Sequence, residues 1–180
     1  MVAEILQYIG DGIKIKPAEA DAMYAGIVID TNNFMNQAGV RTFEAAAFLR
    51  RNGADVVRVR KLFRDKLEDY KARAEAIQKA EICKEYFAIA ECPAEGIESP
   101  TVVGAQAANE MLDIVGIKAS FVLTHLDDTI YFSARSIDEI NVQIMMEKMG
   151  GGGHRTIAGA QLKGATIEEA KVKLKEIKSK

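Results

Sequence analysis

A run of four glycines, Gly150 to Gly153, precedes one of only two histidines in this 180-residue chain. Glycine has no Cβ, so such a run can adopt positive φ and expose backbone N–H groups to a group that comes close. Together with the His154 imidazole, the Arg155 guanidinium and the Thr156 hydroxyl, these N–H groups would suit a phosphate or a carboxylate. The run is not a P-loop, because no Lys-Ser/Thr pair follows it. The alternatives are a hinge, or a tight strand connection with a structural histidine.

A second set of polar side chains follows a predicted strand in YFSARSIDEIN. Ser133 and Arg135 alternate onto one face of that strand, and Asn141 lies in the next predicted helix. An arginine at a strand end facing the glycine run would provide bidentate phosphate recognition. The alternative for Arg135 is a surface ion pair with one of the nearby acids.

One candidate metal ligand is the last residue of the stretch GIVID. Asp30 comes at the end of this buried segment and is followed by Thr31, Asn32 and Asn33, which suits a metal site. A single carboxylate does not make such a site, and no cluster with ligand spacing accompanies it. A capping or turn role for Asp30 is the alternative. His125 lies within an apolar strand pattern and is expected to be structural.

The elements that must position these residues differ between the two ends of the chain. The first 60 residues have helical apolar spacing, with Pro17 at a first helical position, and are expected to be too short to bury a core of their own. A charged helix is predicted over 61–84. Beyond it the runs EYFAIAE, KASFVLTHL, TIYFSAR and AGAQLKG predict strands, with Asp127-Asp128 as a hairpin turn. Helices are predicted near 101–115, 138–148 and 166–178, so the fold class is α/β.

Composition is that of an ordinary globular protein, with 48% hydrophobic and 28% charged residues and a net charge of −2. No global basic field indicates a nucleic-acid partner, although residues 41–80 and 141–180 are locally basic. The spacing of the two cysteines fits no zinc or redox motif, so both are expected to be buried thiols. No apolar run approaches the ~20 residues of a membrane span. We expect a soluble, cytoplasmic chain.

Four stretches together resemble the C-terminal part of a DHH-family phosphoesterase with its DHH-associated domain: AGIVIDTNNF, VRTFEAAAFLRRNGAD, FSARSIDEINV and GGGGHRTIAGAQ. The likeness covers essentially the whole chain and is greatest to the GdpP/YybT type of cyclic-di-AMP phosphodiesterase. The Asp-His-His motif itself and the family's early His/Asp cluster are missing. The resemblance therefore implies a fragment. Residues 1–60 would be a short helical remnant of the DHH catalytic domain, 61–84 a connecting helix, and 85–180 a substrate-binding α/β DHH-associated domain with a mixed sheet.

The same resemblance implies roles for individual residues. The family's catalytic domain holds two Mn²⁺ ions, and Asp30 is the one counterpart of their ligands here, so the fragment is expected to bind metal incompletely or not at all. Gly151, Gly152, Gly153 and His154 would hold a substrate phosphate or base. Arg135 and Ser133 would assist them, with Arg41 as a weaker candidate.

For the intact protein the resemblance implies hydrolysis of cyclic-di-AMP to pApA by two-metal chemistry, with this part in the cytosol of a membrane-anchored protein. The fragment is expected to bind cyclic-di-AMP or short adenine oligonucleotides, to be inactive alone, to make no membrane contact, and to be capable of forming a homodimer. One alternative is the oligoribonuclease and 3′-phosphoadenosine-phosphate phosphatase branch of the superfamily. Others are a nucleic-acid-binding module without chemistry, whose binding face would be the basic segments, and a dimerising scaffold.

Overall fold

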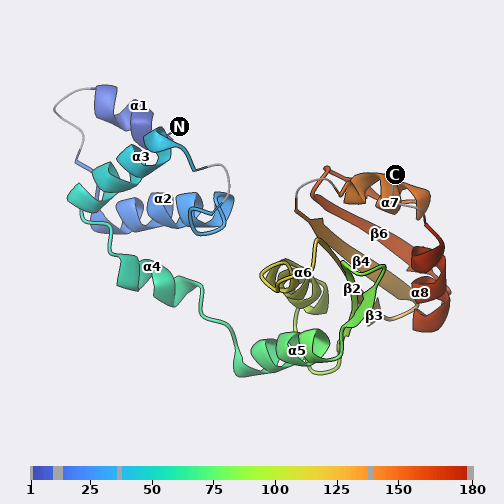
Figure 1. Cartoon of the computed structure of the whole chain (residues 1–180). Coiled ribbons are helices and arrows are strands. Elements are labelled where there is room, and N and C mark those ends of the chain that lie inside the picture. Colours follow the sequence, from blue (N-terminus) through green and yellow to red (C-terminus); the bar gives the residue numbers. More distant parts are fainter. Residues whose placement is uncertain (1, 10–13, 36–37, 138–139, 178–180) are drawn as a thin grey trace. The chain divides into compact units, whose positions relative to one another are not determined.

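The computed structural model describes the chain except for residues 1, 10–13, 36–37, 138–139 and 178–180. It forms two compact units, Met1–Arg64 and Asp65–Lys180, each of which is described by itself (Figure 1). Within the described residues, no helix combines the length and apolar character needed to cross a bilayer.

The first unit contains four helices in its described residues: α1 (Val2–Tyr8), α2 (Pro17–Asp30), α3 (Val40–Arg51) and α4 (Val56–Leu62). Pro17 begins α2, as the sequence predicts. Contrary to expectation the unit has a core, although a small one that consists mainly of alanine side chains around the fully buried Leu49. Buried Asp21 joins α2 to α4, because its Oδ2 accepts a 2.7 Å hydrogen bond from Arg58 Nε and its Oδ1 one of 2.7 Å from the Asp55 N–H.

A helix occupies only part of the predicted range 61–84. The chain instead leaves α4 after Leu62, re-enters a helix at α5 (Leu67–Gln78), and then forms a short strand, β1 (Glu81–Cys83). A buried arginine explains the break: Arg73 Nη2 of α5 donates to Asp65 Oδ2 at 2.7 Å. The chain has to turn before α5 for the Asp65 carboxylate to reach this guanidinium. The helical periodicity of the sequence does not predict this contact between Arg73 and Asp65.

The second unit is a six-stranded mixed sheet in the order β1-β2-β3-β4-β6-β5. The strands after β1 are β2 (Phe87–Cys92), β3 (Ala119–Leu126), β4 (Thr129–Ser136), β5 (Gly152–Gly153) and β6 (Ile157–Lys163). Among the strand pairs formed by the described residues, β2–β3 alone is parallel. The hairpin predicted at Asp127-Asp128 is confirmed between β3 and β4, where Asp127 takes the left-handed φ of +55° that such a turn requires. The two glycines of β5 form an edge strand, which the sequence did not predict.

Helices cover the two faces of this sheet unequally (Figure 1). On one face α7 (Val142–Lys148) and α8 (Ile167–Glu176) enclose the larger core, with Phe121, Leu123 and Ile130 at its centre. On the opposite face α5 and α6 (Pro100–Met111) pack against β2 and β3 through small side chains. The same face of β4 and β6 is less well covered, since Tyr131 and Ser133 are only half-buried there. The α/β class with a mixed sheet is confirmed, and the less covered part of the sheet is where a ligand could reach it.

Candidate functional site

Three rows of side chains cross the open part of the sheet, because the β4–β6 and β5–β6 registers align them. Tyr131 of β4 lies opposite Gln161 of β6. The next row on the same face is nearly bare: Ser133 lies opposite Gly159, which in turn lies opposite Gly152 of β5. Arg135 begins the third row, opposite Ile157. The face thus changes from neutral polar groups, through a nearly bare and half-buried strip, to a cation.

A hollow of about 350 Å³ lies at the first two rows, between the beginning of α6, β4, β6 and the glycine run. We call it the sheet hollow. Its lining comprises Thr101, Tyr131, Phe132, Ser133, Gly150, Gly151, Gly159, Ala160 and Gln161. Of the residues predicted from the sequence, Ser133 and Gly151 line this hollow, whereas Gly152, Gly153, His154 and Arg135 lie outside its lining.

The first glycine of the run ends α7. Gly150 has φ +83°, its N–H bonds the Glu147 carbonyl at 3.0 Å, and the Gly151 N–H bonds the Met146 carbonyl at 2.8 Å. These two bonds are the Schellman arrangement, in which a left-handed residue after the helix satisfies its last carbonyls.

The other glycines permit close approach of β5 to β6. A Cβ at Gly151 would lie 2.0 Å from the Gly159 carbonyl oxygen, and one at Gly153, where φ is +146°, would lie 2.5 Å from the Ala158 Cα. Gly152 differs from both, since a Cβ there would have nothing within 4 Å. The sequence predicted one bare cradle, but only Gly152 combines open space with a backbone that any residue adopts.

His154 begins the tight turn that joins β5 to β6. Its N–H bonds the Ile157 carbonyl at 2.7 Å and its carbonyl accepts from the Ile157 N–H at 3.2 Å. Two further bonds anchor the turn, from the Val142 N–H to the Arg155 carbonyl and from the Ser136 N–H to the Thr156 carbonyl, both at 3.0 Å. The imidazole is exposed, and within the described residues it makes no hydrogen bond. The backbone here is fixed while the ring is left available to a ligand.

Arg135 is a half-buried cation that bonds, among the described residues, only to neutral groups. Its Nε donates to Asn109 Oδ1 of α6 at 3.0 Å and its Nη1 to the Ala134 carbonyl at 2.9 Å. Burial lowers the pKa of the guanidinium, which nevertheless remains protonated. The surface ion pair considered from the sequence is not formed with any described residue. A desolvated charge is costly, and no counter-ion for this one lies among the described residues, so the arrangement favours an anionic ligand.

Asp30 is exposed at the end of α2, and the three residues Asn32, Asn33 and Phe34 that follow have φ of 45°, 59° and 66°. Thr31 ties the turn together by donating to the Ile27 carbonyl at 2.6 Å and accepting from the Phe34 N–H at 3.0 Å. Nowhere in the described ranges do three His, Cys, Asp or Glu residues gather as a metal site requires. These residues alone therefore do not fit a manganese centre.

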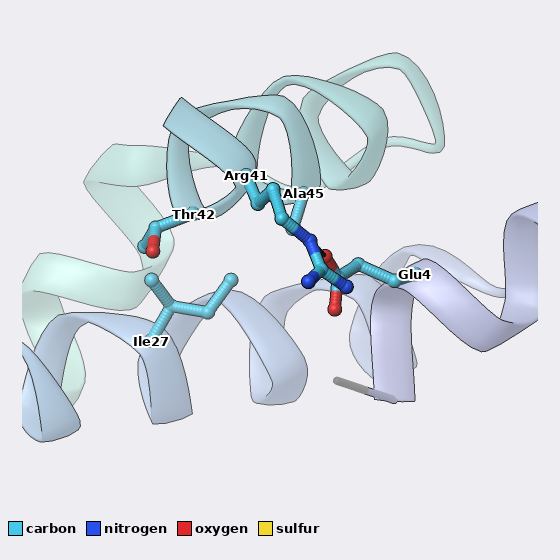
Figure 2. A pocket seen from close by; sticks show the side chains of 5 residues that line it. All are labelled: Glu4, Ile27, Arg41, Thr42 and Ala45. Carbon is cyan, nitrogen blue, oxygen red and sulfur yellow. Dashed lines mark hydrogen bonds and ion pairs between the residues drawn. The ribbon is translucent and has the colours of Figure 1, made fainter. Parts of the chain in front are cut away.

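Arg41, the weaker candidate for ligand binding, lines a different hollow of about 400 Å³ within the first unit (Figure 2). Its Nε lies 2.7 Å from Glu4 Oε1, and this hydrogen bond lowers the pKa of the Glu4 carboxyl. Ile27, Thr42 and Ala45 complete the lining. Unlike Arg135, Arg41 is strongly exposed and already has a carboxylate partner, so it would have to leave Glu4 to bind an anion.

Sequence reasoning missed four residues of the site: Thr101, Asn109, Tyr131 and Gln161. Tyr131 could have been found, because it lies two residues before Ser133 and so shares its face of the strand. Gln161 depends on the β4–β6 register, and Thr101 and Asn109 on the packing of α6. None of these three has a local sequence signal.

Comparison with known proteins places the site in a family context. The DHHA1 domain model matches residues 86–180. The chain is 42% identical over 177 residues to the cyclic-di-AMP phosphodiesterase GdpP of Geobacillus thermodenitrificans (strain NG80-2), covering 98% of this chain and 27% of that protein. It is also 42% identical over 175 residues to the cyclic-di-AMP phosphodiesterase PdeA of Listeria monocytogenes, covering 97% and 26%. The chain thus spans about a quarter of the length of these relatives.

A solved structure has the same fold over almost the whole chain. An exopolyphosphatase-related protein from Bacteroides fragilis superposes with a TM-score of 0.83 at 21% identity, covering 97% of this chain and 55% of that one.

Proposed function

The chain belongs to the DHHA1 domain family, and from this premise we propose that its second unit binds the nucleotide substrate of a cyclic-di-AMP phosphodiesterase. The observation that carries the proposal is the half-buried Arg135 guanidinium, bonded to neutral groups at the edge of an open sheet face. The names of relatives at 42% identity supply the substrate class.

In this proposal each side chain has a physical task. Arg135 donates charge-assisted hydrogen bonds to a substrate phosphate, which are roughly twice as strong as neutral ones. The bare row at Ser133, Gly159 and Gly152 lets the ligand approach the backbone closely. The exposed His154 ring adds a hydrogen-bond donor beside this row. Such positioning and charge neutralisation contribute to phosphodiester cleavage without any bond being broken by these residues.

Hydrolysis itself we assign to the intact protein. The family's two-metal chemistry supplies an activated water when the ions are bound. The described residues offer Asp30 as a single candidate ligand, so we propose that this fragment binds cyclic-di-AMP without hydrolysing it. Incubation of the chain with Mn²⁺ and cyclic-di-AMP, followed by chromatography, should yield no pApA. Robust turnover that an Asp30→Ala change abolishes would contradict this.

The binding proposal is tested by titration calorimetry of the 180-residue chain with cyclic-di-AMP. Arg135→Ala should weaken binding by about tenfold or more, since a hydrogen bond to a charged group is worth about 1.5–3 kcal/mol. Arg60→Ala, which removes an exposed arginine from the other unit, is the matched control and should bind like the parent chain. Equal losses in both variants, or no binding by the parent chain, would refute the proposal.

A non-catalytic nucleic-acid-binding module is disfavoured by the ion pairs of the basic segment 41–80. Many of its cations already have carboxylate partners: Arg41 with Glu4, Arg58 with Asp21, Lys66 with Glu98, Arg73 with Asp65 and Glu110, and Lys79 with Glu75. Neutralised cations release few counterions from a phosphate backbone. Binding to long single strands should therefore be weak and only shallowly dependent on salt.

A further inference from the structure

We propose that the sheet hollow receives a nucleobase, with Tyr131 and Gln161 as the residues that select adenine. The inference deepens the proposed nucleotide-binding function and rests on it. It assigns the two parts of the ligand to different rows of the sheet: the base to the Tyr131–Gln161 row and the phosphate to Arg135.

The lining of the hollow argues for a base rather than a phosphate. Its polar groups are the hydroxyls of Thr101, Ser133 and Tyr131 and the amide of Gln161, and no residue of the lining is charged. Phosphate is recognised by cations, whereas bases are recognised by neutral donors and acceptors together with an aromatic surface. The cation begins one row further on, because Arg135 follows Ser133 by two residues, a step of about 7 Å along a strand.

Tyr131 and Gln161 are placed to act as a pair. They face each other across the β4–β6 ladder on the open side of the sheet, a position in which Cβ atoms are about 4.5–5.5 Å apart. Within the part of the chain that the structure describes, neither side chain has a hydrogen-bond partner. The phenol ring therefore offers a stacking surface, and the amide is free to bond a ligand.

The chemistry of the amide predicts which base is preferred. A glutamine side chain presents one donor and one acceptor side by side, which match the N7 acceptor and N6 donor of adenine. Guanine presents two acceptors, N7 and O6, along the same edge, so the amide can satisfy only one of them. The volume of about 350 Å³ lies at the small end of the range for ligand pockets, which suits one nucleoside rather than a whole cyclic dinucleotide.

The test uses adenosine, guanosine and inorganic phosphate as separate probes of the ¹⁵N-labelled 180-residue chain by NMR. Adenosine should shift the Gln161 side-chain amide and the backbone of Thr101 and Gly151, and should bind about tenfold more tightly than guanosine. Phosphate should instead shift the Arg135 Nε–H. In Gln161→Leu the preference for adenosine should disappear, while Gln78→Leu, which removes an exposed amide from α5, should retain it.

The outcomes separate this inference from the function on which it rests. Adenosine shifts that lie away from the hollow, or an undiminished preference in Gln161→Leu, would overturn the base site even if cyclic-di-AMP binds through Arg135. If adenosine binds in the hollow but cyclic-di-AMP does not bind the chain, the base site stands and the proposed substrate falls.

Discussion

Alanine substitution at three successive glycines should have three different effects, because the structure gives each glycine a different reason to be there. In Gly151→Ala the new Cβ would lie 2.0 Å from the Gly159 carbonyl oxygen, and in Gly153→Ala 2.5 Å from the Ala158 Cα. Both obstacles are backbone, so β5 and β6 must separate. Overpacking of this kind costs about 1–3 kcal/mol, which lowers Tm by roughly 4–12 °C. Gly153→Ala should be the more damaging, since its φ of +146° adds strain.

Gly152→Ala should behave in the opposite way. Its Cβ would meet nothing within 4 Å, and removing a glycine at a compatible position stabilises a protein by about 0.4–1 kcal/mol through the unfolded state. The new methyl would nevertheless stand on the bare row beside Gly159 and Ser133, where the ligand is proposed to approach. We therefore expect unchanged or raised stability together with a fall in cyclic-di-AMP affinity of roughly tenfold.

Differential scanning calorimetry and titration calorimetry on the same three variants measure both effects. The contrast between neighbours is the internal control, because the substitution is identical each time. Equal destabilisation by all three changes would refute the close approach of β5 to β6. Full affinity in Gly152→Ala would refute the proposal that ligand lies over the bare row.

Three further outcomes are expected. Asn109→Ala removes the acceptor that holds the Arg135 Nε at 3.0 Å and should weaken cyclic-di-AMP binding several-fold, with little loss of thermal stability because Asn109 is exposed. Unchanged affinity in titration calorimetry would contradict this positioning role of Asn109. Hydrogen bonding to Arg58 lowers the pKa of Asp21 in the folded state, so the stability that this pair gives the first unit is present above the carboxyl's unfolded pKa of ~3.9 and is lost as pH falls further. In Asp21→Asn the free energy of unfolding should therefore fall less steeply with decreasing pH in this acidic range. Burial raises the pKa of the Cys92 thiol to about 11, so its alkylation, followed by mass spectrometry, should remain slow at pH 8 unless the protein unfolds.

Much of the second unit could be predicted from local pattern. In TIYFSARS the buried and half-buried positions alternate along β4 as the sequence suggests, and this alternation placed Ser133 and Arg135 on one face. The two aspartates between β3 and β4 identified the hairpin, since a left-handed turn residue is favoured there. These features depend on neighbours within a few residues.

The features that sequence reasoning missed depend on partners far along the chain. The break before α5 exists because Arg73 bonds Asp65 while also lying against α6 through Gln106 at 3.0 Å. The glycines of the run differ in role because β6 approaches some of them more closely than others. Four identical residues in a sequence cannot indicate such a difference. Gln161 joins the site only through its register with Tyr131.

The anchoring of the glycine run at both ends has a consequence for binding kinetics. A free stretch of four glycines samples many conformations, and a ligand would have to select one of them at a cost in affinity. Here the Schellman bonds at Gly150 and Gly151 and the turn at His154 impose that selection during folding. Association should therefore proceed at a rate set by diffusion and orientation, with no slow loop-ordering phase, so that differences in affinity among nucleotides appear mainly as differences in their dissociation rates.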